Sequence, residues 1–387
     1  MQHFKNNPSY QNTDTILSPK LFDDAYASIK NWAGYKPSPL HHLDDLAKDF
    51  GVDQIYFKDE SERFGLKSFK ALGGAYAVVQ VLKEHLSTLL SDHTITDQEI
   101  LSGKFAEPLK DFTVVTATDG NHGRSVAWGA QQCGINCRIY MHKGVSKSRG
   151  VSVERLGAKV IWVDGNYDDS LQEVKQDALK NDWHIISDTS YDGYTYVPKF
   201  VMAGYSVMTH EIAKQLSNSP NPTHVIIQGG VGGLAGAICA HAAALWGEHR
   251  PNFIIVEPET ADCLHQSAKN GQPKMVHIKE ETLMGGLSCG EVSLIGWDIL
   301  KNNANDFVTI SDANVKAAMR LMARGTGNDP KVEAGESAVA GIALLMDLKN
   351  HTDIKENLGL DENSRILLFG TEGATDQQMY DDILSGD

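Results

Sequence analysis

The sequence predicts an α/β protein built from two open, mostly parallel sheets with helices on both faces. Short β-rich runs alternate with longer segments of helical periodicity along most of the chain. Several of these runs are almost continuously apolar, which is typical of strands that are covered on both faces. The length of 387 residues exceeds one ordinary core, so two domains are expected.

The expected elements follow from composition and periodicity. Runs rich in Val, Ile, Tyr and Phe predict strands at 54–60, 111–118, 137–141, 159–164, 184–187, 224–228, 252–257, 307–311 and 365–370. Helical periodicity predicts helices at 68–85, 120–133, 166–181, 197–216, 233–246 and 314–323. The strands between 113 and 187 predict one sheet, and those from 224 to 370 predict a second sheet that N-terminal chain can complete.

The domain boundary is expected where the alternation breaks. DGYTYVP, residues 192–198, interrupts the pattern of strands and helices. We therefore expect a large domain of residues 1–80 and 196–387, which binds the cofactor discussed below. Residues 81–195 form the expected small domain.

Charge and composition exclude several classes of protein. The formal charge of −15 repels phosphate backbones, so no nucleic-acid partner is expected. No apolar run approaches the roughly 20 residues that cross a bilayer, and the N-terminus has no export signal, so we expect a cytoplasmic protein without membrane contact. The five cysteines form neither a disulfide framework nor a paired zinc motif, and no metal is expected.

Lys70 is the first candidate for chemistry, since it stands in the first turn of the helix expected at 68–85. Its neighbours Phe69, Ala71 and Leu72 are apolar. Desolvation lowers the pKa of an ammonium group and makes the amine available as a base or for imine formation. Taken alone, a solvated helix lysine is the commoner explanation.

The glycine-rich stretch GGVGGLAG, residues 229–236, follows an expected strand and opens an expected helix. Glycine N–H groups at a helix N-terminus can bind a phosphate group. A plain strand-to-helix turn is the structural alternative. A nicotinamide dinucleotide site is a second alternative, because residues 230–235 fit G-x-G-x-x-G/A and the next expected strand ends in Glu257.

A third motif, ATDGNHGRSVAWGA, spans residues 117–130 and again reads as strand, turn and helix. Asn121 can direct its amide at a phenolic or carboxylate oxygen beside free helix N–H groups. His122 can act as a base, or it can serve as a structural hydrogen-bonding residue at the strand–helix corner.

Together, Ser68–Lys70, Gly120–Gly123 and residues 229–236 resemble the pyridoxal-phosphate enzymes of the tryptophan-synthase β-subunit fold, known as fold type II. Their order and spacing match that family over roughly residues 40–375. The resemblance implies that pyridoxal 5'-phosphate binds between the two domains. It makes Lys70 the Schiff-base lysine, Asn121 the ligand of the phenolic oxygen, and the glycine loop the phosphate site.

Finer motifs resemble the diaminopropionate ammonia-lyases: RFGLKSFKALGG, TDGNHGR, DTSYDGY, EAGESAV and FGTEGATD. Threonine dehydratases of the same fold usually carry a small residue where this chain has Asp119, and Ser-Gly-Gly-Asn where it has Thr371–Ala374. Ala374 is a small departure from the ammonia-lyase pattern as well. The resemblance implies α,β-elimination of 2,3-diaminopropionate, of both L and D forms, to pyruvate and two ammonia molecules. Serine or threonine dehydration is the alternative reaction, and a non-catalytic ligand-binding protein is the alternative class.

The resemblance also assigns roles to residues. Lys70 would remove the Cα proton, Asp119 could act as a base on the opposite face, and Thr371 would face the pyridine nitrogen. Asp119 or Asp188 would lie near the β-ammonium of the substrate. The structural alternatives are a helix N-cap for Asp119 and a turn residue for Asp188. Glu336, or Glu333, would lie over the ring. The expected catalytic residues are Lys70, Asp119 and Asp188; the cofactor residues are Phe69, Lys70, Asn121, Gly230, Val231, Gly232, Gly233, Leu234, Glu336 and Thr371; the substrate residues are Thr118, Asp119, Asn121, His122 and Asp188.

Two further expectations concern assembly and redox chemistry. The resemblance implies a homodimer that acts on a small amino acid. Cys263 precedes residues 277–290, a segment typical of a mobile lid, and Cys289 lies near the end of that segment. They could pair on oxidation, and two buried free thiols are the alternative.

Overall fold

The chain forms two compact units in the computed structural model, which describes residues 1–91, 94–118 and 120–386. The first unit contains Met1–Pro19, Pro37–Phe69 and the chain from Met208 onward. The second unit contains Lys20–Lys36 and Lys70–Val207. Each unit is built around one sheet, which confirms the predicted α/β class with two mostly parallel sheets.

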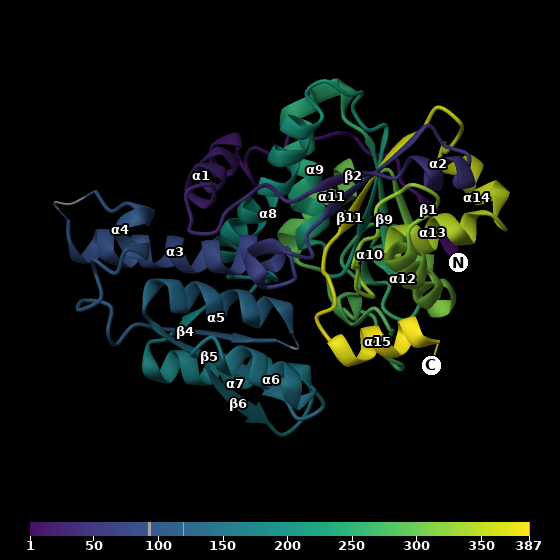
Figure 1. Ribbon diagram of the computed structural model, residues 1–387. Coiled ribbons are helices and arrows are strands. Elements are labelled where there is room, and N and C mark those ends of the chain that lie inside the picture. The colour runs from purple at the N-terminus through teal and green to yellow at the C-terminus, as the bar shows by residue number, and fades with distance from the viewer. Residues whose placement is uncertain (92–93, 119, 387) are drawn as a thin grey trace. The chain divides into compact units, whose positions relative to one another are not determined.

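The first unit contains a seven-stranded sheet in the order β1-β10-β9-β8-β11-β3-β2 (Figure 1). The strands are β1 (Gln2–Lys5), β2 (Leu40–His42), β3 (Gln54–Asp59), β8 (His224–Gln228), β9 (Asn252–Pro258), β10 (Asp306–Ile310) and β11 (Arg365–Gly370). The five central strands are parallel, and β1 and β2 add antiparallel edges. N-terminal chain therefore completes this sheet, as predicted. The two edge strands were not individually predicted, because QHFK and LHH are short and carry no apolar run.

Helices cover both faces of this sheet. One face packs against α2 (Asp44–Phe50), α12 (Val315–Arg324), α13 (Ala340–Leu348) and α15 (Gln377–Ser385). On that side the strands contribute alternate residues such as Ile226, Ile254 and Leu368 to the core, while their neighbours Val225 and Ile255 are buried on the other side. The opposite face carries α9 (Gly233–Trp246) and α11 (Leu294–Asn303), which pack against each other (Figure 1).

The second unit contains a four-stranded parallel sheet in the order β6-β5-β4-β7. The strands are β4 (Thr113–Ala117), β5 (Asn136–His142), β6 (Lys159–Val163) and β7 (His184–Ile185), close to the predicted ranges. Figure 1 shows α5 (Asn121–Cys133) and α7 (Tyr167–Asn181) on opposite sides of this sheet. The α7 helix begins where predicted because the Asn166 side chain accepts a hydrogen bond from the Asp169 N–H group.

The unit boundaries differ from the predicted division at 80/81 and 195/196. All of α3 (Lys70–Leu89) lies in the second unit, and α8 (Tyr196–Gln215) is divided between the units after Val207. The reason for the first difference is close packing of α3 on α5. A Cβ atom added to Gly129 would lie 2.7 Å from the Ala75 Cα, and one added to Gly74 would lie 2.3 Å from the Ser125 Oγ. Glycine at both positions lets the helices approach closely enough to form one body.

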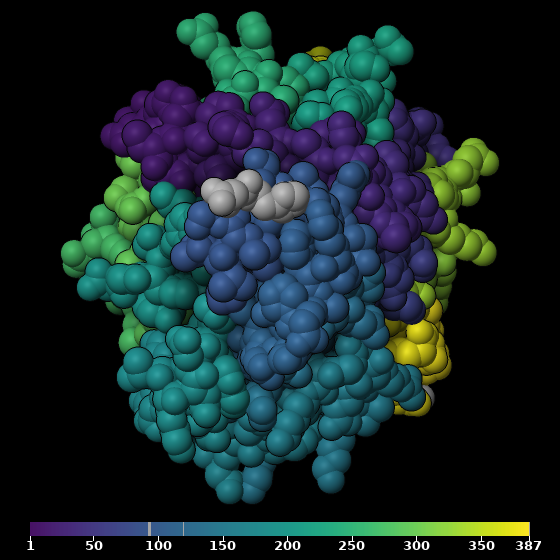
Figure 2. All heavy atoms as spheres, turned by 90° about the vertical axis from the view of Figure 1, so that its left-hand side faces the viewer, coloured from purple at the N-terminus to yellow at the C-terminus, as the bar shows by residue number. Residues whose placement is uncertain are grey.

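The remaining helices are short, and they are α1 (Pro19–Ile29), α4 (Asp97–Leu101), α6 (Lys147–Glu154), α10 (Cys263–Asn270) and α14 (Thr352–Asn357). The atoms of α3 and α4 are drawn in blue in Figure 2. None of the helices in the described part of the chain combines the length and apolar character that crossing a membrane requires.

Candidate active site

The residues immediately before Lys70 are held in an unusual backbone conformation. Phe64 and Lys67 have φ values of 52° and 53°, which side chains other than glycine rarely adopt. Ser68 forms a β-bridge with Glu372, and the Phe69 N–H group donates to the Thr371 carbonyl at 3.0 Å. Strained residues persist when their surroundings fix them, and such residues gather at functional sites. The end of β11 thus fixes the segment that leads into Lys70.

Lys70 begins α3, and its amine lies against a carboxylate of the same unit. The Lys70 Nζ donates to the Asp188 Oδ2 at 2.5 Å and lies 5.8 Å from the ring centroid of Tyr205. The Lys70 side chain is 24% exposed and that of Asp188 17%. Lys70 is therefore not a fully solvated helix lysine. Two predicted catalytic residues, 118 positions apart in the chain, lie together.

His122 completes this group from the start of α5. Its Nε2 lies 2.8 Å from the Ile186 carbonyl, which can only accept, so the proton resides on Nε2 and Nδ1 keeps its lone pair. The Nδ1 is buried, has no hydrogen-bond partner among the described residues, and lies 3.7 Å from the Asp188 Oδ2. Burial lowers the pKa of His122 below its ordinary value, although Asp188 opposes that shift.

Asp188 stays ionised in this environment. Burial alone would raise the pKa of its carboxyl, but His122 and Lys70 outweigh burial and hold the pKa below its ordinary value. Asp188 therefore acts as a fixed negative charge beside the Lys70 amine, rather than as a proton donor.

The turn before α5 is shaped by Thr118. Its hydroxyl oxygen accepts hydrogen bonds from the N–H groups of Gly120 and Gly123, at 3.1 and 3.3 Å. This turn sets Asn121 as the first residue of α5. Asp119 lies outside the described residues, and its predicted role stays a prediction.

The glycine loop of the first unit has the geometry of an anion site. Gly230 and Gly232 have φ values of 54° and 92°, and α9 begins at Gly233. The first N–H groups of a helix have no acceptor within that helix. None of the described residues accepts a hydrogen bond from the N–H groups of Gly230, Val231 or Gly233. A Cβ atom added to Gly230 would meet nothing closer than 3.8 Å, so the loop leaves room for a ligand group. The residues present thus fit a phosphate.

Thr371 and Glu336 lie in the same unit as this loop. Thr371 follows β11, Glu336 precedes α13, and both are buried. Glu333, the alternative to Glu336, pairs with Lys67 at 2.9 Å and accepts a hydrogen bond from the Ala374 N–H group. These contacts favour Glu336 as the residue near the ring, which stays a prediction.

Glu257 does not serve as the ribose ligand of a dinucleotide site. Its carboxylate is fully buried and accepts hydrogen bonds from the N–H groups of Leu264 and His265, at 2.9 and 2.7 Å. Burial raises the pKa of Glu257 to about 8, against the effect of these two bonds. Glu257 thus caps α10, and the nicotinamide reading of residues 230–235 loses the acid on which it depended.

Cys263 and Cys289 are free thiols in the structure. The Cys263 thiol is buried and donates to the Gly230 carbonyl, while a Cβ atom added to Gly230 would lie 3.8 Å from the Cys289 sulfur. Both cysteines therefore flank the glycine loop. Their pairing on oxidation stays a prediction.

Tyr205, whose ring lies near the Lys70 amine, was not among the residues predicted from the sequence. Tyr205 stands in the long apolar stretch of α8, where an aromatic residue indicates core packing. No signal in the sequence separates it from that core.

Comparison with known proteins agrees with this geometry. Residues 32–368 match the family described as "Pyridoxal-phosphate dependent enzyme". The chain is 40% identical over 360 residues to the diaminopropionate ammonia-lyase of Escherichia coli K12, covering 91% of this chain and 88% of that protein. It is similar to the crystal structure of the holo diaminopropionate ammonia lyase from Escherichia coli, with a TM-score of 0.91, 36% identity, and coverage of 99% of this chain and 96% of that one. The structure of the same enzyme with an aminoacrylate-PLP azomethine reaction intermediate is also similar, with a TM-score of 0.89, 35% identity, and the same coverage.

The fold, the group formed by Lys70, Asp188 and His122, and the glycine loop define a protein that binds pyridoxal phosphate and acts on amino acids. The chain belongs to the pyridoxal-phosphate dependent enzymes and, within them, to the diaminopropionate ammonia-lyase family.

Proposed function

We propose that this protein is a pyridoxal-phosphate-dependent lyase that converts 2,3-diaminopropionate, in both L and D forms, to pyruvate and two ammonia molecules. The observation that carries the proposal is the 2.5 Å contact between the Lys70 amine and the Asp188 carboxylate. The 40% identity to an ammonia-lyase of this substrate over 91% of the chain supports it.

Lys70 would hold the cofactor through its amine, and Asn121 would bind its phenolic oxygen. The loop Gly230–Leu234 would bind its phosphate, and Phe69, Glu336 and Thr371 are the remaining predicted cofactor residues. Bound pyridoxal phosphate supplies an electron sink that stabilises the charge left when the Cα proton is removed.

Lys70 and Asp188 carry the proton chemistry. After the substrate amine displaces Lys70 from the cofactor, the freed Lys70 amine would accept the Cα proton, and the ionised Asp188 would stabilise the resulting ammonium group. A β-amine leaves readily only as a protonated group, and a fixed carboxylate also favours the charged form of that amine. The His122 Nδ1 lies 3.7 Å from the Asp188 carboxylate, so His122 is the third polar group of this cluster.

Asp119 is the candidate base for the opposite face of the substrate. It stands next to Gly120 and Asn121 in the sequence, where threonine dehydratases of this fold usually have a small residue. A carboxylate there gives the D isomer a base that Lys70 cannot provide.

The test measures pyruvate release from L- and D-diaminopropionate, with serine and threonine alongside. Wild-type enzyme should turn over both diaminopropionate isomers faster than either hydroxy amino acid. Asp119→Asn should slow the D isomer by about 10² to 10⁴ and the L isomer far less. Equal loss for both isomers would instead make Asp119 a ligand of the β-ammonium. Faster release from serine or threonine would assign the protein to the dehydratases.

Cytoplasmic location and a homodimer remain predictions. Gel filtration with light scattering on the holoenzyme measures the oligomeric state.

A further inference from the structure

Gln228 is a buried amide that the proposed reaction does not use. It is the last residue of β8 and directly precedes the glycine loop at Gly229. The residue is 4% exposed. Its Nε2 lies 3.0 Å from the Ser337 carbonyl, 3.2 Å from the Ala338 carbonyl and 2.8 Å from the Phe369 carbonyl.

The orientation of this amide follows from its partners. Carbonyl oxygens only accept hydrogen bonds, so the NH₂ group of Gln228 must face all three. The Oε1 atom is then left buried without a hydrogen-bond partner among the described residues. Burial of an unpartnered acceptor costs stability, and the same space could be filled by an apolar side chain at no such cost. The donors of this amide therefore serve a purpose that packing alone does not require.

The three carbonyls belong to the two segments that carry the proposed ring residues. Phe369 lies two positions before Thr371 on β11. Ser337 follows Glu336, and its N–H group donates to the Glu372 carboxylate at 3.2 Å. The Gln228 side chain thus joins both segments to the strand from which the phosphate loop emerges. All of these residues lie in the first unit.

A rigid cofactor requires this kind of connection. The phosphate and the pyridine nitrogen of pyridoxal phosphate stand at opposite ends of one small planar molecule. A protein that contacts both ends binds tightly only when the two contact regions keep a fixed separation. One side chain that donates to both segments next to the loop can hold that separation.

We infer that Gln228 is a positioning residue that sets the phosphate loop against the Thr371 and Glu336 end of the cofactor site. The inference rests on the proposed function, in that both regions hold the same pyridoxal phosphate molecule. It goes beyond that function because Gln228 touches neither cofactor nor substrate in this role and acts through the backbone.

The experiment compares Gln228→Met with Ile226→Ala. Methionine keeps the length of the side chain and removes the amide donors. Ile226 is the matched control, because it lies two residues earlier on the same strand and in the core cluster on the side of α13. For each variant, urea unfolding of the apoenzyme measures stability, and titration of the folded apoenzyme with pyridoxal phosphate measures the dissociation constant.

Gln228→Met should raise the dissociation constant for pyridoxal phosphate by tenfold or more, whereas Ile226→Ala should change it less than threefold while destabilising the apoenzyme at least as much. A cofactor affinity that follows stability equally in both variants would overturn the inference, since Gln228 would then be a packing residue only. Unchanged affinity in Gln228→Met would overturn it as well.

Gln228→Glu supplies an independent readout and serves if the methionine variant does not fold. A protonated carboxyl can donate one hydrogen bond, but an ionised one places negative charge against three carbonyl oxygens. Its dissociation constant should therefore rise more steeply than that of the wild type between pH 6 and pH 8.5. Parallel pH profiles would contradict the inference. Failure of the proposed function itself is seen separately, as wild-type enzyme that binds no pyridoxal phosphate.

Discussion

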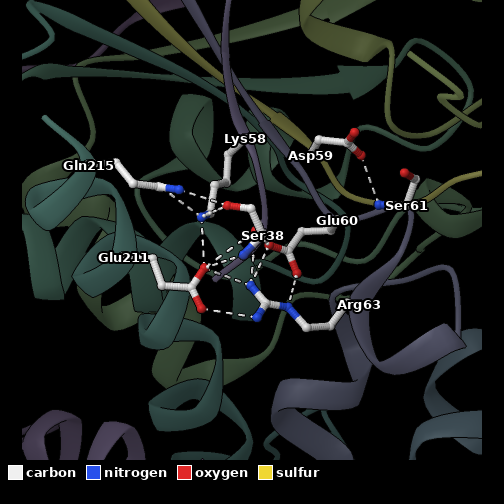
Figure 3. Close-up of polar contacts among 8 residues, drawn as sticks. All are labelled: Ser38, Lys58, Asp59, Glu60, Ser61, Arg63, Glu211 and Gln215. Carbon is white, nitrogen blue, oxygen red and sulfur yellow. Dashed lines mark hydrogen bonds and ion pairs between the residues drawn. The ribbon is translucent and has the colours of Figure 1, made fainter. Parts of the chain in front are cut away.

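Lys58 and Lys70 each pair with a carboxylate, and their surroundings differ in what a small molecule can reach. The Lys58 side chain is completely buried, and its amine donates to the Ser38 carbonyl, the Glu211 carboxylate and the Gln215 amide oxygen, at 2.8, 2.7 and 3.0 Å (Figure 3). These three bonds use all three protons of the ammonium group. The Lys70 side chain is 24% exposed beside Asp188.

Lys58 belongs to a closed network of charges, which we call the buried ion network: Ser38, Lys58, Glu60, Arg63, Glu211 and Gln215. Arg63 donates to Glu60 and Glu211, at distances from 2.7 to 3.0 Å (Figure 3). Two positive groups thus face two carboxylates. Burial lowers the pKa of Lys58, although Glu211 and Glu60 oppose the shift. Burial and an ion pair therefore do not by themselves make a lysine reactive, because its amine must also be accessible.

The largest expected effect is the loss of catalysis in Lys70→Ala. Turnover of L-diaminopropionate should fall by at least about 10² to 10⁴, and the visible absorption of lysine-bound cofactor should disappear. Lys70→Arg is the matched control, because arginine keeps the positive charge beside Asp188 but stays protonated and cannot bond the cofactor. Full activity in either variant would show that Lys70 is not the reactive lysine. The apoenzyme of Lys70→Ala should lose at most about 1 kcal/mol of unfolding free energy, since solvent reaches this pair.

Lys58→Met should have the opposite effects to Lys70→Ala: a large loss of stability and intact cofactor binding. Removal of one partner leaves a buried carboxylate uncompensated, which costs about 3–5 kcal/mol of unfolding free energy. The folded fraction should still bind pyridoxal phosphate through Lys70. Urea denaturation of the apoenzyme and a cofactor titration measure the two quantities.

A double variant sharpens this result. Lys58→Met with Glu211→Gln leaves Arg63 facing Glu60, so the charges balance again. The double variant should therefore lose less unfolding free energy than the two single variants lose together, by more than about 0.5 kcal/mol. Strict additivity would indicate that the charges of the network do not interact.

A smaller effect concerns the pH dependence of stability, through His122 beside Asp188. The pKa of His122 is lowered in the folded state, so the unfolded chain takes up a proton first as the pH falls below about 6.5. Stability should then decline with falling pH in that window, by at most about 1.4 kcal/mol per pH unit for this one group. His122→Gln removes this titration, so the excess unfolding free energy of the wild type over the variant should decrease as the pH falls from 7 to 5. An unchanged slope in the variant would show that His122 is not the titrating group.

The sequence predicted the parts of the site that depend on local motifs. Lys70, Asn121 and the glycine loop each stand at a strand–helix junction, and adjacent residues determine that geometry. Asp188 was predicted because it follows a strand end. The partners that complete these groups come from distant segments: Glu211 meets Lys58 across 153 positions, and KDE at 58–60 reads as a polar strand end. Pairings of this kind follow from tertiary packing, which no local pattern specifies. For the same reason the sequence did not indicate that α3 joins the second unit through Gly74 and Gly129.

The most direct test of the account is to identify the lysine that carries the cofactor. Holoenzyme is reduced with borohydride, digested and analysed by mass spectrometry for a phosphopyridoxyl group. We expect the modified peptide to contain Lys70 and the peptide with Lys58 to be unmodified, because the Lys58 amine is fully buried and fully hydrogen-bonded. A phosphopyridoxyl group on Lys58, or on any lysine other than Lys70, would contradict it.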